Sequence, residues 1–185
     1  MDEARLLAAR TQSAQGAPLA MDLLDRLVAH DAWTTRQLLL LAEPLTEAQW
    51  TQPFDIGHVT LRATLEHMIY NVETWTALMN GEQHPDAQPT FVGLSASELL
   101  ARHDASMAAF ADLAQRIRFA GAWDMLWVDI LDDPPAEKTY GGAIAHVITH
   151  NMHHRSEVMH MLHRLGVENV IEGDVLSWEA AASQL

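Results

Sequence analysis

Apolar residues recur every three or four positions along most of this chain, which is the spacing of one face of an α-helix. The pattern predicts long amphipathic helices at about residues 19–42, 60–79, 95–119 and 140–166. Three of these segments end at or just before a helix-ending residue, which is Pro44, Gly81 or Gly166. Ser95 and Glu98 form a capping box at the start of the third segment. The sequence therefore predicts an all-α protein, a four-helix bundle with a short tail helix.

Two connections between the predicted helices are long. Residues 82–94 contain two prolines and a glycine and predict a long crossover past one end of the bundle. Residues 120–139 contain short aromatic and aliphatic runs, which fit either a small hairpin or a lid over the bundle end. Residues 1–18 predict a flexible polar lead-in, so a single helical domain is expected over residues 19–185.

Histidines are concentrated in the fourth predicted helix, which holds six of the eleven in the chain. His150 and His154 lie one turn apart, at the border between the apolar face and a more polar side. Two imidazoles in this arrangement can bind one metal ion. His146 and His153 lie on the more polar side. Because a chain with many histidines contains such a pair by chance, the pair indicates a metal site only together with a third ligand.

His67 is the candidate third ligand. It takes the same border position on the second predicted helix, with Asn71 one turn further on. Bundles place ligands on facing helices, so His67, His150 and His154 are predicted to converge on one divalent cation. Three protein nitrogens with a free coordination position are typical of catalytic zinc-type sites, whereas structural sites are closed. The competing interpretation of His67 is a core histidine that is satisfied by neighbouring groups.

Charge and composition narrow the function classes. The net charge is −14 and the 11 lysines and arginines are scattered, which argues against a nucleic-acid-binding surface. The absence of cysteine removes disulfides, thiol nucleophiles and cysteine-type zinc sites. No apolar run reaches membrane-spanning length, and the acidic N-terminus does not fit a signal peptide. A cytoplasmic protein is therefore expected.

Two segments resemble the DinB superfamily (DinB/YfiT-like proteins). They read TLEHMIYNVETWTALMNG on the second predicted helix and AIAHVITHNMHHRSEVMHMLHRLG on the fourth, within a resemblance over roughly residues 19–180. The resemblance implies a metal-binding triad at His67, His150 and His154, a divalent ion such as zinc or nickel, and a homodimer. Ser156 and Glu157 stand where the family usually has glycine and often has glutamine. The resemblance therefore does not carry a substrate pocket over to this chain.

The expected metal site is compatible with two reaction classes on a small-molecule substrate. A hydrolase would use a water activated by the metal, and a transferase or isomerase would use the thiolate of a low-molecular-weight thiol cosubstrate. Glu157 is the candidate general base, and the candidates for the pocket or for orienting the ligands are His146, Asn71 and Trp75. The alternative is a non-catalytic helical-bundle binding or stress-response module with a structural or vestigial metal site.

The large apolar side chains bear on assembly. The chain has six tryptophans and nine methionines, and both types are enriched at protein interfaces, which adds support to the homodimer. The alternative interpretation is that Trp123 and Trp127 cover the end of the bundle over the metal pocket. Neither nucleic acid nor a membrane is an expected partner.

Overall fold

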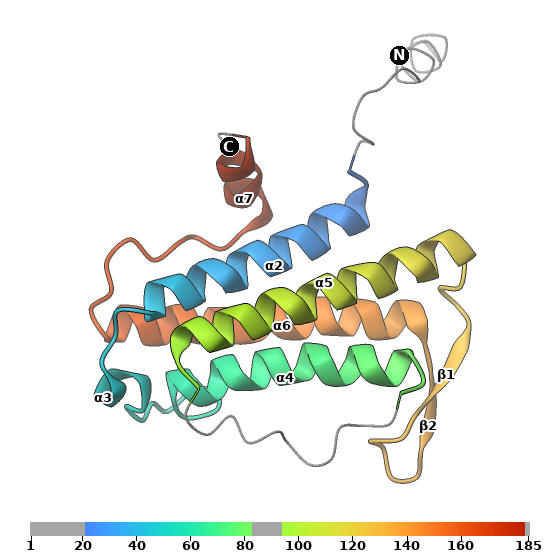
Figure 1. Ribbon diagram of the computed structural model, residues 1–185, viewed down its shortest axis with the longest axis horizontal. Helices are drawn as coiled ribbons and strands as arrows, with labels where there is room; N and C mark the ends of the chain where they lie inside the picture. The colour runs from blue at the N-terminus through green and yellow to red at the C-terminus, as the bar shows by residue number, and fades with distance from the viewer. Residues whose placement is uncertain (1–20, 83–93, 184–185) are drawn as a thin grey trace.

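Four long helices pack side by side in the computed structural model, which describes residues 21–82 and 94–183 (Figure 1). They are α2 (Leu23–Ala42), α4 (Leu61–Met79), α5 (Ala96–Ala120) and α6 (Tyr140–Arg164). The shorter elements are α3 (Glu47–Trp50), β1 (Leu126–Asp129), β2 (Ala136–Thr139) and α7 (Val175–Ala182). The predicted all-α bundle is confirmed. The predicted lead-in at 1–18 and most of the predicted crossover, 83–93, lie outside the described residues.

Side-chain caps explain where the long helices begin. Asp22, Thr60, Ser95 and Thr139 each precede one of them, and each side-chain oxygen accepts a hydrogen bond from the backbone N–H three residues later. This bond satisfies one of the N–H groups that the first helical turn leaves unpaired. The capping box predicted at Ser95 is present, since the Glu98 carboxylate accepts in return from the Ser95 N–H at 2.8 Å.

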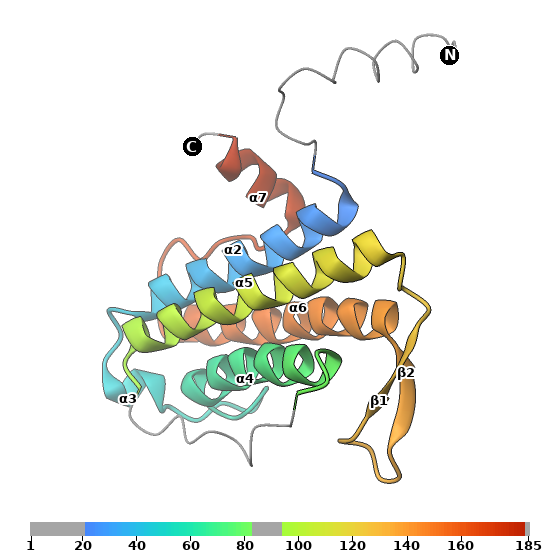
Figure 2. The same cartoon turned by 45° about the vertical axis from the view of Figure 1, so that its right-hand side comes forward.

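The bundle contains two pairs of helices that run in the same direction (Figures 1 and 2). Helices α4 and α5 both start at the end of the bundle near α3, whereas α2 and α6 both start at the opposite end. The histidine-bearing helices α4 and α6 are therefore antiparallel neighbours.

The segment between α5 and α6 is a hairpin that also covers one end of the core. Strands β1 and β2 pair antiparallel, with Leu126 opposite Thr139. Trp127 is buried and meets Trp75 edge to face, with 5.8 Å between the ring centroids. Both interpretations of residues 120–139 therefore apply, a hairpin and a cover. In the part of the chain that the structure describes, no helix has the length and apolar character needed to cross a membrane.

The core consists of two apolar clusters separated by buried polar side chains at mid-bundle. One cluster, near the hairpin, includes Phe110 and Val147, and the other, near α3, includes Leu65 and Leu162. Each long helix contributes buried polar residues between the two clusters. We name this set the polar layer; it comprises His30, Asp31, Thr34, Thr35, Asn71, His103, Ser106, Asn151, His154 and Arg155.

An ion pair between α2 and α6 lies inside the polar layer. Asp31 is 0% exposed and Arg155 is 2% exposed, and the Arg155 guanidinium contacts the Asp31 carboxylate directly. Asn151 Nδ2 donates a second bond to Asp31 Oδ2 at 2.9 Å. Burial lowers the pKa of Arg155 to about 10, which leaves the guanidinium protonated at neutral pH. The pair fixes α6 against α2 directly beside His154.

Candidate metal centre

Two histidines one turn apart on α6 meet a third from α4. The Nε2 atom of His150 lies 3.1 Å from Nε2 of His154 and 3.2 Å from Nε2 of His67. The ring centroids of His67 and His154 are 4.8 Å apart. His154 is buried, and the other two are half-buried. The structure therefore brings together the three histidines that are the predicted ligands.

Two of the nitrogen separations, from His150 to His154 and from His150 to His67, are close to those between ligands of one metal ion. Metal–nitrogen bonds of ~2.0–2.1 Å in tetrahedral geometry place the ligand nitrogens ~3.3–3.4 Å apart. Hydrogen bonds among the rings are a poorer solution, because an imidazole nitrogen offers either one hydrogen or one lone pair. His150 Nε2 therefore pairs well with only one of its two neighbours. A cation between the rings would use one lone pair from each.

Glu157 fixes the orientation of His154. Its Oε2 lies 2.7 Å from Nδ1 of His154, and its Oε1 lies 3.1 Å from Nε2 of His153. Because the carboxylate accepts the Nδ1–H of His154, the lone pair of the neutral ring is on Nε2, the atom that faces His150. Glu157, the candidate general base, is itself buried. It is placed to orient a histidine and not to face a substrate.

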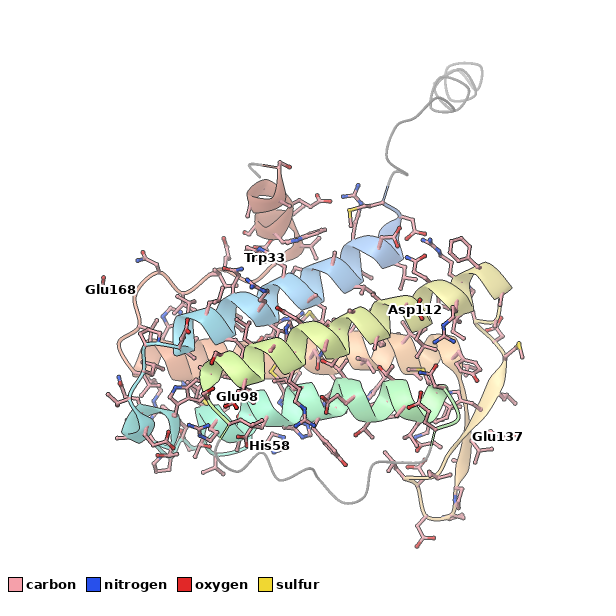
Figure 3. The ribbon with its side chains drawn as sticks, in the orientation of Figure 1. Trp33, His58, Glu98, Asp112, Glu137 and Glu168 are labelled. Carbon is pink, nitrogen blue, oxygen red and sulfur yellow. The ribbon has the colours of Figure 1, made fainter. Side chains whose placement is uncertain are left out.

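His58 belongs to the same cluster, although helical periodicity does not identify it. It lies in the loop between α3 and α4, next to the first half of α4 (Figure 3). Its ring stacks on His67 with 3.9 Å between the centroids. Ligand nitrogens of His58, His67 and His154 all lie within 4.8 Å of one another, so these three residues could hold a metal ion. The sequence signal is limited to a histidine just ahead of the helix cap at Thr60.

A cavity of about 340 Å³ borders the cluster on the hairpin side. It is lined by Trp75, Lys138, Thr139, Gly142, Ala143 and His146. The His146 ring stacks on His150 with 5.2 Å between centroids, and the Trp75 ring lies 4.8 Å from His146. Two of the pocket candidates from the sequence, Trp75 and His146, therefore line a cavity next to the predicted ligands.

The remaining pocket candidate, Asn71, is buried in the polar layer. Its Nδ2 has no hydrogen-bond partner among the residues that the structure describes.

A larger cavity of about 700 Å³ lies between α2 and α5, with apolar side chains such as Val28 and Met107 in its wall. Its lining among the described residues includes no histidine, whereas His146 lines the smaller cavity. The smaller cavity is therefore the candidate substrate pocket, because it adjoins the groups that can do chemistry.

Comparison with protein families matches residues 30–158 to the DinB superfamily. The chain belongs to the DinB superfamily. The family match confirms the resemblance seen on α4 and α6, and the matched region contains His58, His67, His150, His154 and Glu157. Neither the curated proteins nor the solved structures gave a match.

The electrostatics of this DinB-superfamily site favour neutral imidazoles. Burial, followed by the neighbouring histidines, lowers the pKa of His67 to about 4 and that of His150 to about 4. Burial also lowers the pKa of His58, with His154 adding to the effect and Glu157 opposing it. Neutral imidazole is the form that binds a metal ion, so these rings keep their lone pairs available at neutral pH.

Acidification is expected to destabilise the metal-free protein through His67 and His150. Each has a pKa of 6.5 when unperturbed and about 4 in the fold, so the unfolded chain binds more protons between these values. The free energy of unfolding should therefore fall as the pH drops from about 6.5 to about 4. The effect is moderate because both rings are partly exposed.

Urea unfolding at several pH values, with chelator present, measures this dependence. A His67→Gln/His150→Gln double variant controls for the other titrating groups and should give a flatter pH profile. An equally steep profile in the double variant would contradict the prediction.

Proposed function

We propose that this protein is a divalent-metal-dependent enzyme that converts a small molecule, with zinc or nickel held by His67, His150 and His154. The proposal is carried by the approach of His150 Nε2 to within 3.1 Å and 3.2 Å of the Nε2 atoms of His154 and His67. Three neutral nitrogen ligands leave one position for a water or a substrate, as in catalytic zinc sites.

The side chains around the cluster orient the ligands and keep them neutral. Glu157 holds His154 with its Nε2 toward the other rings, and burial keeps His67 and His150 unprotonated. When bound, a divalent cation supplies Lewis-acid chemistry, which activates either a water for hydrolysis or the sulfur of a small thiol for transfer or isomerisation. Because the chain has no cysteine, any thiol has to arrive as a cosubstrate.

The cavity beside His146 is the proposed substrate pocket. Its volume of about 340 Å³ is at the small end of the range for ligand pockets. Trp75 offers a flat apolar wall, and Lys138 Nζ lies 5.6 Å from the centroid of that ring. Lys138 is already paired with Asp129 and Asp132. The pocket therefore favours a neutral, partly apolar molecule over a strong anion.

Metal analysis combined with turnover assays tests the proposal. The purified protein should hold a single zinc or nickel ion per chain, and a His67→Ala/His150→Ala double variant should hold none. Turnover of small esters or amides without a thiol would indicate a hydrolase. Turnover of an electrophile only in the presence of a thiol such as glutathione would indicate a transferase. Wild-type protein without metal under metal-replete conditions would contradict the proposal, and a loaded protein inactive in both assays would favour the binding module.

A further inference from the structure

We propose that His58 is a fourth metal ligand, which closes the site at rest and is displaced when a substrate binds. The inference rests on the proposed function, because it requires the ion held by His67, His150 and His154. It changes the centre from three nitrogens with a permanently free position to four nitrogens, one of them exchangeable.

The position of the His58 ring supports a ligand role. It stacks on His67 at an interplanar angle of 29°, and its centroid lies 5.3 Å from that of His154. A ligand nitrogen of His58 is within 4.8 Å of ligand nitrogens on both of these residues. The ligands of a tetrahedral ion are ~3.3–3.4 Å apart, so His58 exceeds this spacing from His67 and from His154 by at most ~1.5 Å.

The backbone on both sides of His58 has an unusual conformation. Gly57 and Val59 have φ angles of 59° and 71°. A positive φ is strained for a β-branched residue such as Val59. Hydrogen bonds hold the loop in this shape, since the Phe54 N–H donates to the Val59 carbonyl at 2.6 Å and the His58 N–H donates to Thr64 Oγ1 at 3.3 Å. Strain of this kind is concentrated at functional sites, because the surrounding structure has to maintain it.

Gly57 allows the loop to approach the metal centre closely. A Cβ atom at this position would lie 2.7 Å from Glu157 Oε2 and 3.2 Å from Thr64 Oγ1. Glu157 is the residue that orients His154, so the loop backbone contacts the group that positions a predicted ligand. The loop that carries His58 is therefore packed directly against the centre.

Exposure makes His58 the exchangeable member of the four. His58 is exposed and comes from a loop, whereas His154 is buried and His67 and His150 are half-buried on long helices. Solvent exposure gives an incoming molecule access to the His58 position. Replacing His58 would move an exposed side chain on a loop, while the other three side chains are packed between long helices.

Cobalt-substituted protein gives a direct test, because the visible absorption of Co²⁺ reports the number and type of its ligands without a substrate. The wild type, His58→Ala and His163→Ala are compared; His163 is exposed on α6 and lies outside the cluster, which makes it the matched control. His58→Ala should keep one cobalt per chain, change the spectrum and lose at least ~10-fold in affinity in chelator competition. Added imidazole should restore the wild-type spectrum in His58→Ala.

Different results would overturn the assignment of His58 as a fourth ligand and the proposed function. His58→Ala protein with the spectrum and affinity of the wild type would overturn the fourth-ligand assignment and leave the proposed function standing. Wild-type protein that takes up no cobalt would overturn both. Circular dichroism of the metal-free proteins verifies that the variants are folded, as expected for substitutions at exposed positions.

Discussion

Replacing His154 by alanine is expected to abolish tight binding of a divalent metal ion to this protein. His154 is the buried member of the cluster, and its Nε2 lies 3.1 Å from that of His150. Glu157 holds the ring from the other side, at Nδ1. The loss should exceed the ~10–100-fold drop in affinity that follows removal of a group that only orients a ligand. Calorimetric titration with zinc or competition with a chelator measures it.

Two further variants place the size of this loss in context. Glu157→Gln keeps the imidazole of His154 but weakens its orientation, so its metal affinity should fall by about 10–100-fold. His146→Ala removes an exposed ring that stacks on His150 without belonging to the predicted ligands. Its metal affinity should remain near that of the wild type. Equal affinities in His154→Ala and His146→Ala would refute the assignment of His154 as a ligand.

Replacing Arg155 by methionine is expected to lower the free energy of unfolding by about 3–5 kcal/mol. Asp31 is 0% exposed, and in this variant its carboxylate would keep the bond from Asn151 but lose its countercharge. An uncompensated buried charge is much more costly than a broken pair at the surface. Urea unfolding of the metal-free protein measures the loss without a contribution from metal binding.

Two variants serve as controls for this loss of stability: one removes both buried charges, and the other breaks an ion pair at the surface. An Asp31→Leu/Arg155→Met double variant removes both charges and should recover most of the lost stability. Arg164→Met breaks the pair between Arg164 and Asp55, whose side chains are 46% and 89% exposed, and should cost about 0–1 kcal/mol. If Arg155→Met costs no more than Arg164→Met, the pair in the polar layer does not stabilise the fold as argued.

The long helices of this protein can be predicted from its sequence because their signals are local. The capping box at Ser95 and Glu98 is present in the structure, and the helix expected at 140–166 is observed at Tyr140–Arg164. The proximity of His67 to His150 and His154 can also be predicted, because all three lie at the border of an apolar face. Such borders face one another in a bundle. Their role as metal ligands stays a prediction, as does the homodimer.

The parts that could not be predicted depend on contacts between distant segments. His58 lies in a loop without periodicity, and the packing of that loop against Glu157 and Thr64 brings it to His67. The shared direction of α4 and α5 is likewise not encoded in either helix alone. Glu157 could be placed on α6 from the sequence, but its engagement by two histidines depends on which rotamers the packed site allows.

The polar layer limits how far the helices can slide past one another. In a bundle with an apolar core from end to end, one helix can shift by a turn, ~5.4 Å, with little change in burial. A slip of α6 would here carry Arg155 away from Asp31 and into an apolar cluster, where neither charge has a partner. The axial position of α6 is thereby set, and with it the height of His150 and His154 relative to His67. Metal coordination tolerates errors of only ~0.2 Å in ligand distances. The buried ion pair therefore helps to set the positions of the histidines along the bundle axis.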